Sequence, residues 1–207
     1  MNGNSFFPVF LNISGKQVLI IGGGQVALRK CRNLASFGPN IIVIAPEITP
    51  EIPQIQNVQV KRRKANISDI HEAMQLVILA TNDQSAQQML AEECKKRKIL
   101  FNRCDDPNDS DFVTGSLIAK YPITASVVTS GSPSISKMIK HRIEKILDPS
   151  LIDLAQLMNE IRPRIIKKFT NREEKETFLN RWVSENILER ISREGIDSIR
   201  QEILTCL

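Results

Sequence analysis

The stretch Val18-Leu-Ile-Ile-Gly-Gly-Gly-Gln-Val-Ala-Leu-Arg-Lys30 decides the fold of this chain. Its first four residues are apolar, as in a strand buried on both faces of a sheet, and its second half has helical periodicity. Small residues stand at the three positions of the G-x-G-x-x-G/A pattern, namely Gly22, Gly24 and Ala27. We therefore predict a dinucleotide-binding turn between a strand and a helix.

Each part of such a turn has its own task. The first glycine permits the tight bend, the second lets a pyrophosphate approach the backbone, and Ala27 keeps the helix close to the sheet. The free N–H groups around Gln25 and Val26 then meet the phosphates, with the helix dipole behind them. The alternative is a glycine-rich turn that binds nothing. The strand before the glycines and the helix after them favour the binding turn.

A second apolar run, residues 40–47, ends about 20 residues beyond the glycines, where the second strand of a dinucleotide-binding domain ends. Its end should meet the adenosine ribose. Glu47 is the only acid nearby, and the backbone around Ala45 and Pro46 is the other candidate for this contact. No Arg or Lys lies between Ala45 and Glu51 to receive a 2′-phosphate, so the sequence favours NAD over NADP.

Strands and helices continue to alternate as far as residue 111. We predict a helix at 84–98 and further strands at 57–61, 76–80 and 99–101. This order is typical of a doubly wound parallel sheet, in which ligands bind outside the carboxyl ends of the strands. Thr81 follows one of these strands and is expected beside the cofactor. Asp105 and Asp106 follow another.

The pattern changes after Pro107. Two β-rich runs, 112–118 and 123–128, are expected to pair antiparallel, and Ser132 and Pro133 then begin a helix as its N-cap and first residue. This helix has an apolar face, formed by Ile135, Ile139, Ile143 and Ile146. The remainder is predicted to be helical, at 151–162, 165–169, 172–192 and from 197 onward.

We therefore predict an α/β protein of three parts. A Rossmann-like NAD-binding domain (1–111) precedes a small β-plus-helix dimerisation region (112–147) and a C-terminal helical domain (148–207). The middle region has too little partner surface in one chain to bury its apolar side chains, so we expect it to pack against a second copy.

Composition restricts the class of protein. The chain has 207 residues and 42% hydrophobic residues, but no apolar run of 18 or more and no signal-type N-terminus. Its four cysteines form no C-x-x-C pair, and His71 and His141 are far apart, so we expect free thiols and no metal site. These features predict a cytoplasmic protein without a membrane partner.

The net charge of +5 is modest. The only dense basic cluster, residues 61–64, follows a predicted strand and is interpreted as a solvated strand end. No aromatic residues alternate with it, which argues against a nucleic-acid partner. A small polyanionic substrate would suit a basic enzyme.

Several short motifs together carry a family resemblance. They are Phe7-Pro-Val-Phe-Leu-Asn12, Gly22-Gly-Gly-Gln-Val-Ala-Leu-Arg-Lys30, Ala80-Thr-Asn-Asp83, Asn102-x-x-Asp105-x-Pro107, Phe112-x-x-x-Ser116 and Ser132-Pro133. From about residue 6 onward the chain closely resembles the precorrin-2 dehydrogenase module of siroheme synthases. It departs from that family in one loop: members commonly have Ser/Thr-Gly-Gly-x-Ser-Pro, and this chain has the shorter Thr129-Ser-Gly-Ser-Pro133.

The resemblance implies NAD-dependent oxidation of precorrin-2 to sirohydrochlorin, in some members followed by insertion of Fe²⁺. It also implies a homodimer with the active site near the subunit junction. Asp105 occupies the position of the carboxylate to which the family's chemistry is attributed, and we expect it to act as the general base. The neighbouring Asp106 should raise the upper apparent pKa of the pair. Thr129 is given an auxiliary role, and His141 a place on the surface.

Three alternatives remain open at this point. Both acids could merely end a strand and cap the turn before Pro107. The chain could be an NAD-binding sensor that catalyses nothing, although a sensor has no need of carboxylates at the fifth strand. It could also be a dehydrogenase for another polyanionic substrate.

Overall fold

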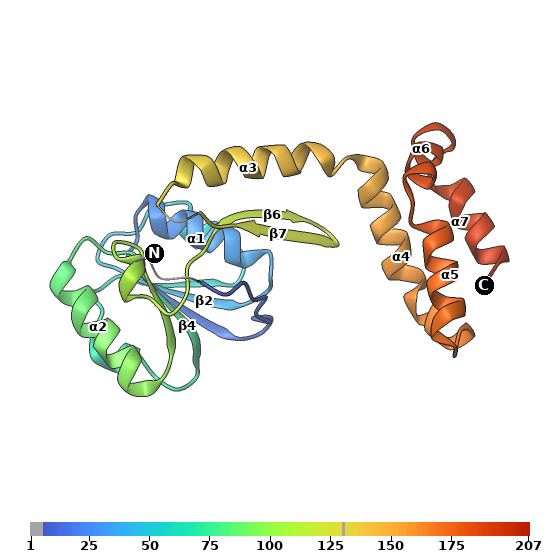
Figure 1. Cartoon of the computed structure of the whole chain (residues 1–207). Helices are drawn as coiled ribbons and strands as arrows, with labels where there is room; N and C mark the ends of the chain where they lie inside the picture. The colour runs from blue at the N-terminus through green and yellow to red at the C-terminus, as the bar shows by residue number, and fades with distance from the viewer. Residues whose placement is uncertain (1–5, 130) are drawn as a thin grey trace. The chain divides into compact units, whose positions relative to one another are not determined.

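The computed structural model describes residues 6–129 and 131–207 and divides into two compact units. The first unit ends at Val113 and the second begins at Thr114. The first unit contains five strands and two α-helices (Figure 1): β1 (Gln17–Ile21), α1 (Gln25–Ala35), β2 (Asn40–Ile44), β3 (Val58–Lys61), β4 (Met74–Leu79), α2 (Gln84–Arg97) and β5 (Leu100–Arg103).

The five strands form one parallel sheet in the order β3-β2-β1-β4-β5. In its centre, Ile20 of β1 lies opposite Val43 of β2 and Ile78 of β4. The chain runs outward from β1 to β3 and then returns to start β4 on the other side of β1. This reversal places a ligand crevice at the carboxyl ends of β1 and its neighbours. The predicted Rossmann-like doubly wound sheet is confirmed.

One helix layer covers each face of the sheet. Val18 and Ile20 pack with Ala27 and Cys31 of α1, whereas the intervening strand residue Leu19 belongs to the opposite cluster. That second cluster includes Leu90, Ala91 and Cys94 of α2. Burial on both faces explains why β1 is apolar throughout rather than alternating.

Two strands of this sheet end two or more residues away from the predicted position. β2 stops at Ile44 instead of residue 47, because Pro46 has no N–H group to donate to a neighbouring strand. β5 extends to Arg103 instead of ending at Phe101. The polar residues Asn102 and Arg103 are buried in this strand, which is possible because both are hydrogen-bonded.

The second unit consists of a β-hairpin and five helices, namely β6 (Ser116–Lys120), β7 (Ile123–Val127), α3 (Pro133–Ile146), α4 (Pro149–Lys168), α5 (Arg172–Trp182), α6 (Glu185–Glu194) and α7 (Ile196–Thr205). The predicted antiparallel pairing is confirmed, with Ile118 opposite Ala125. Ser132 is the N-cap of α3 and Pro133 its first residue, also as predicted. The Ser132 side chain makes no capping hydrogen bond.

The C-terminal helices differ from the prediction in two places. α4 continues through Pro163 instead of ending before it, and its buried residues Ile161 and Ile165 lie on either side of the proline. The predicted single helix 172–192 is interrupted near Ser184, the N-cap of α6. The spacing of five residues between buried Trp182 and Ile187 does not fit one helical face, which explains the interruption.

The three-part division of the chain stays a prediction. Within the part that the structure describes, no helix is both long and apolar enough to span a bilayer.

Candidate functional site

The glycine turn after β1 contains three glycines with different constraints. Gly22 has φ +122°, and a Cβ there would lie 2.2 Å from the Ala80 carbonyl oxygen. A Cβ on Gly23 would lie 2.0 Å from the Glu47 carbonyl oxygen. Gly24, the N-cap of α1, has an ordinary φ of −87° and no atom within 4 Å of its Cβ position. The first two glycines are required by packing, whereas Gly24 leaves the helix end open.

The open end of α1 suits an anion. The first turn of a helix has N–H groups without intrahelical acceptors, and α1 begins at Gln25. Gln25 and Val26 are both exposed, and the first helical bond runs from the Leu28 N–H group to the Gly24 carbonyl (2.9 Å). The turn therefore has the shape and the donors that a dinucleotide pyrophosphate requires.

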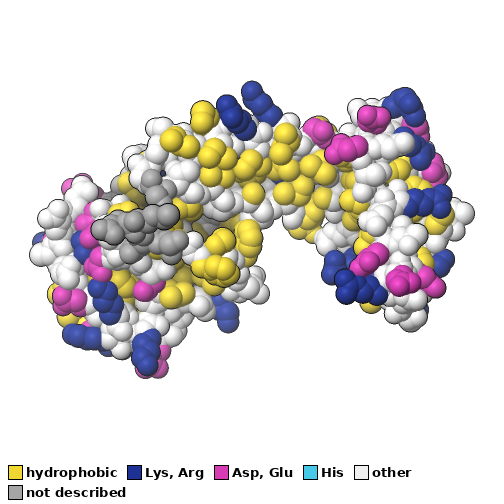
Figure 2. Space-filling model, in the orientation of Figure 1, with side chains coloured by type: hydrophobic (Ala, Val, Ile, Leu, Met, Phe, Trp, Pro, Cys, Tyr) yellow, Lys and Arg dark blue, Asp and Glu magenta, His cyan; other side chains and the backbone are white. Residues whose placement is uncertain are grey.

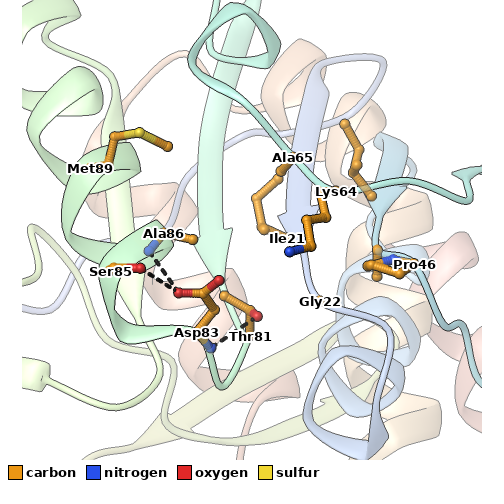
Figure 3. A pocket seen from close by; sticks show the side chains of 12 residues that line it. Ile21, Gly22, Pro46, Lys64, Ala65, Thr81, Asp83, Ser85, Ala86 and Met89 are labelled. Carbon is orange, nitrogen blue, oxygen red and sulfur yellow. Dashed lines mark hydrogen bonds between the residues drawn. The ribbon is translucent and has the colours of Figure 1, made fainter.

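A cavity of about 460 Å³ lies at the carboxyl ends of the strands (Figure 3). It brings together four of the predicted cofactor residues, Gly22, Ala45, Pro46 and Thr81. The other lining residues are Ile21, Ile44, Lys64, Ala65, Asp83, Ser85, Ala86 and Met89. The predicted residues Gly24, Gln25, Val26 and Asp105 are not part of this lining.

One cation of the basic cluster 61–64 belongs to the cavity, which sequence reasoning missed. Arg63 is held by Asp69, with 2.7 Å between Nη1 and Oδ2, and also donates to the Lys64 carbonyl (3.0 Å). The side chain of Lys64 lines the cavity instead. Lys64 is exposed, as a solvated strand end predicts, but its side chain also borders the cavity.

The guanidinium of Arg103, at the end of β5, donates hydrogen bonds to both carboxylate oxygens of Asp105. Nε of Arg103 lies 3.3 Å from Oδ1, and Nη2 lies 3.0 Å from Oδ2. Nη1 of Arg103 is held in turn by Gln88 of α2 and by Asp109, each at 2.9 Å. Asp105 retains partial exposure, with 32% of its side chain accessible. The network presents a fixed carboxylate to solvent.

The pKa of Asp105 is shifted downward. The hydrogen bonds from Arg103 hold the pKa of Asp105 below its usual range. The upward shift expected for the upper apparent pKa of the pair is not found at Asp105, where the guanidinium of Arg103 is the largest influence. Asp105 is therefore an ionised acceptor at neutral pH.

Asp106 has a different task from Asp105. Its Oδ1 accepts the N–H groups of Asn108 (3.0 Å) and Asp109 (3.4 Å) and thereby caps the turn Pro107–Asp109. The strand-end alternative thus describes Asp106, whereas Asp105 makes its side-chain bonds with Arg103.

Buried polar groups fix the end of β5 against α1. The ammonium group of Lys30 lies 3.4 Å from Oδ1 of Asn102, and Nδ2 of Asn102 donates to the Phe112 carbonyl (3.0 Å). Burial lowers the pKa of Lys30. The half-buried thiol of Cys104 contacts the same Asn102 oxygen.

The remaining expected residues lie in the second unit. Thr129 donates its hydroxyl to the Ser132 carbonyl (2.6 Å), which closes the loop before α3. Ser130, where the family has glycine, lies outside the described residues. His141 pairs with Glu144 on α3 (3.1 Å). Among the described residues no three His, Cys, Asp or Glu side chains are grouped to hold a metal ion.

Comparison with known proteins places these features in a family context. A family described as putative NAD(P)-binding matches residues 9–116. The siroheme synthase of Nitrosococcus oceani is 29% identical over 189 residues, which are 90% of this chain and 40% of that protein. The siroheme synthase of Zymomonas mobilis is 32% identical over 166 residues, 79% of this chain and 35% of that protein.

A solved structure titled "SirC, precorrin-2 dehydrogenase" shares the fold. It superimposes with a TM-score of 0.77 at 23% identity and covers 97% of this chain and 100% of its own. The resemblance to siroheme synthases found in the sequence is thus confirmed. The chain spans less than half the length of these curated relatives.

Proposed function

The chain belongs to the putative NAD(P)-binding family, and on that premise we propose that it oxidises precorrin-2 to sirohydrochlorin with NAD⁺. One observation carries the proposal: a dinucleotide-binding turn and a fixed, ionised carboxylate stand at the carboxyl ends of the same parallel sheet. The reaction needs both, since one hydrogen leaves the macrocycle as hydride and another as a proton. The relatives named siroheme synthase support the choice of substrate.

The residues divide the work as follows. NAD⁺, when bound, supplies the hydride acceptor. Gly24 admits its pyrophosphate to the N–H groups of Gln25 and Val26, and Ala45, Pro46 and Thr81 border its adenosine half. Asp105 accepts the proton that leaves the substrate, in the orientation set by Arg103.

Three further features belong to the proposal. We include a homodimer formed through residues 112–147, supported by the exposed apolar side chains of Ile135, Met138 and Ile146 on α3. Figure 2 shows apolar side chains gathered along this helix.

We also include a reducing, cytoplasmic location, supported by the four free cysteines. Fe²⁺ is included as a second substrate, to be inserted after the oxidation.

The test supplies enzymatically made precorrin-2 and NAD⁺ to the purified protein. We expect stoichiometric NADH together with the absorption spectrum of sirohydrochlorin, and a further spectral change when Fe²⁺ is added. Binding of NAD⁺ without turnover of precorrin-2 would identify a sensor or a dehydrogenase for another substrate. An unchanged spectrum on adding Fe²⁺ would remove only the insertion step.

A further inference from the structure

The position of Lys64 in the cavity is unexplained by NAD binding alone. Lys64 follows β3, the outermost strand on the side of β2, whereas Asp105 follows β5 at the opposite edge of the sheet. The pyrophosphate site lies between them, at the helix that follows β1. Lys64 therefore stands at the adenosine end of the cofactor site, and the proposed base stands at the nicotinamide end.

The cavity around Lys64 has the lining of a nucleoside site. Its apolar walls come from Ile44 and Pro46 on one side and from Ala86 and Met89 of α2 on the other. Figure 3 shows Lys64 on the same side as Pro46, with Asp83, Ser85 and Met89 across the cavity. A purine base fits between such walls, and a cation beside the end of β2 then faces the ribose.

The backbone that carries Lys64 is rigidly built. The guanidinium of Arg63 grips both oxygens of Asp69 and the carbonyl of Lys64. Asn66 caps the short helix Ile67–Asp69 and completes a reciprocal capping box with Asp69. These bonds hold the loop, and the exposed Lys64 side chain makes no ion pair within 4.0 Å among the described residues.

The acid in the cavity, Asp83, attracts Lys64 electrostatically, but the two side chains make no ion pair within 4.0 Å among the described residues. One oxygen of Asp83 accepts the Ala86 N–H group (3.0 Å) and the Ser85 hydroxyl (2.7 Å), so the carboxylate is committed to starting α2. Lys64 remains available to an anion that enters with the nucleotide. NAD carries no anion at its ribose 2′ position, whereas NADP carries a phosphate there.

We infer that Lys64 forms a binding site for the 2′-phosphate, so that the cofactor cleft takes NADP⁺ as well as NAD⁺. This inference rests on the proposed function, because it assigns a residue within the same dinucleotide cleft. It adds to the expectation of NAD, which followed from the lack of a cation between Ala45 and Glu51. The cation is supplied by the loop after the next strand.

The test measures binding of two fragments by isothermal titration calorimetry, so no catalysis is needed. The fragments are ADP-ribose and 2′-phospho-ADP-ribose, each titrated into the wild type, Lys64→Ala, Lys64→Arg and Lys61→Ala. Lys61 is the matched control, because it is an exposed lysine of the same basic cluster that does not line the cavity.

We expect Lys64→Ala to weaken 2′-phospho-ADP-ribose by about tenfold or more, since a charge-assisted bond to phosphate is lost. The affinity for ADP-ribose should change less than about twofold, and Lys64→Arg should retain the affinity for the phosphorylated fragment. The difference in affinity between wild type and Lys64→Ala should shrink at high salt.

Equal weakening of both fragments by Lys64→Ala, or the same loss of affinity in Lys61→Ala, would overturn the site. If ADP-ribose binds and 2′-phospho-ADP-ribose does not, Lys64 is wrongly assigned while the proposed function stands. If neither fragment binds the wild type, both fail.

Discussion

At the scale of single residues, the glycine turn separates what the fold needs from what the ligand needs. Gly22 cannot carry a Cβ because the Ala80 carbonyl occupies its place, whereas Gly24 has open space around it. The sequence pattern predicted both glycines but assigned no task to Gly23, whose close contact is with the loop after β2. That contact joins segments far apart in the chain, and a local motif carries no information about it.

Gly22→Ala and Gly24→Met should therefore fail in different ways. Gly22→Ala combines a left-handed φ with a backbone clash and should lower the free energy of unfolding by roughly 2–4 kcal/mol. Gly24→Met should leave stability within about 1 kcal/mol of the wild type but obstruct the pyrophosphate. Chemical denaturation and NAD⁺ titration measure the two effects. Undiminished NAD⁺ affinity in Gly24→Met would contradict the assignment of the turn.

Asp105→Asn and Asp106→Asn test the placement of the base. Asp105→Asn keeps the shape of the side chain but removes its proton acceptor, so kcat for precorrin-2 oxidation should fall by about a hundredfold or more. NAD⁺ affinity should hardly change. Asp106→Asn retains an oxygen that can cap the turn Pro107–Asp109 and should cost much less. A larger defect in Asp106→Asn would show that the base is the other acid.

Arg103 should set the acid limb of the pH profile. Because Arg103 lowers the pKa of Asp105, the base stays ionised to lower pH than a free aspartate would. Arg103→Met should raise that pKa, so kcat should begin to fall at a higher pH as the medium is acidified. Lys95→Met is the matched control, since Lys95 pairs with Asp109 and not with Asp105. Identical acid limbs in wild type and Arg103→Met would show that Arg103 does not tune the base.

At the scale of elements, the sequence predicted a strand or helix correctly where a local pattern of residues was enough to determine it. The two-sided apolar run of β1 and the Ser132-Pro133 start of α3 are such cases. It failed for β5, because Asn102 and Arg103 read as loop residues until their partners, Phe112, Gln88 and Asp109, are known. It missed Lys64 for the same reason, since only the tertiary fold brings the loop after β3 to the end of β2.

Pro163 lowers the stability of helix α4, and a substitution could restore it. Proline lacks the N–H group that would bond to the Asn159 carbonyl, yet the helix continues because its apolar face stays buried. Pro163→Ala restores the donor and should raise the free energy of unfolding of the second unit by about 1–3 kcal/mol. Thermal unfolding followed by circular dichroism measures this. A lower midpoint would show that the proline is accommodated by a distortion the fold requires.

At the scale of the whole molecule, the exposed apolar residues of α3 predict assembly. Sedimentation at micromolar concentration should show a dimer, and Met138→Glu should shift it to monomer by placing a charge in an apolar contact. Ile166→Glu is the control, because Ile166 is similarly exposed on α4, outside residues 112–147. A monomeric wild type, or equal effects of both variants, would contradict an interface at α3.

The two buried thiols of the first unit have a consequence for its motions. Cys31 belongs to α1 and Cys94 to α2, and each is fully buried in the core cluster between its helix and the sheet. Burial raises the pKa of Cys31 to about 11 and that of Cys94 to about 12, and only the thiolate reacts with alkylating reagents. Neither sulfur can be modified until its own helix lifts away. The rate of alkylation at Cys31 therefore reports how often α1 separates from the sheet, and the rate at Cys94 reports the same for α2.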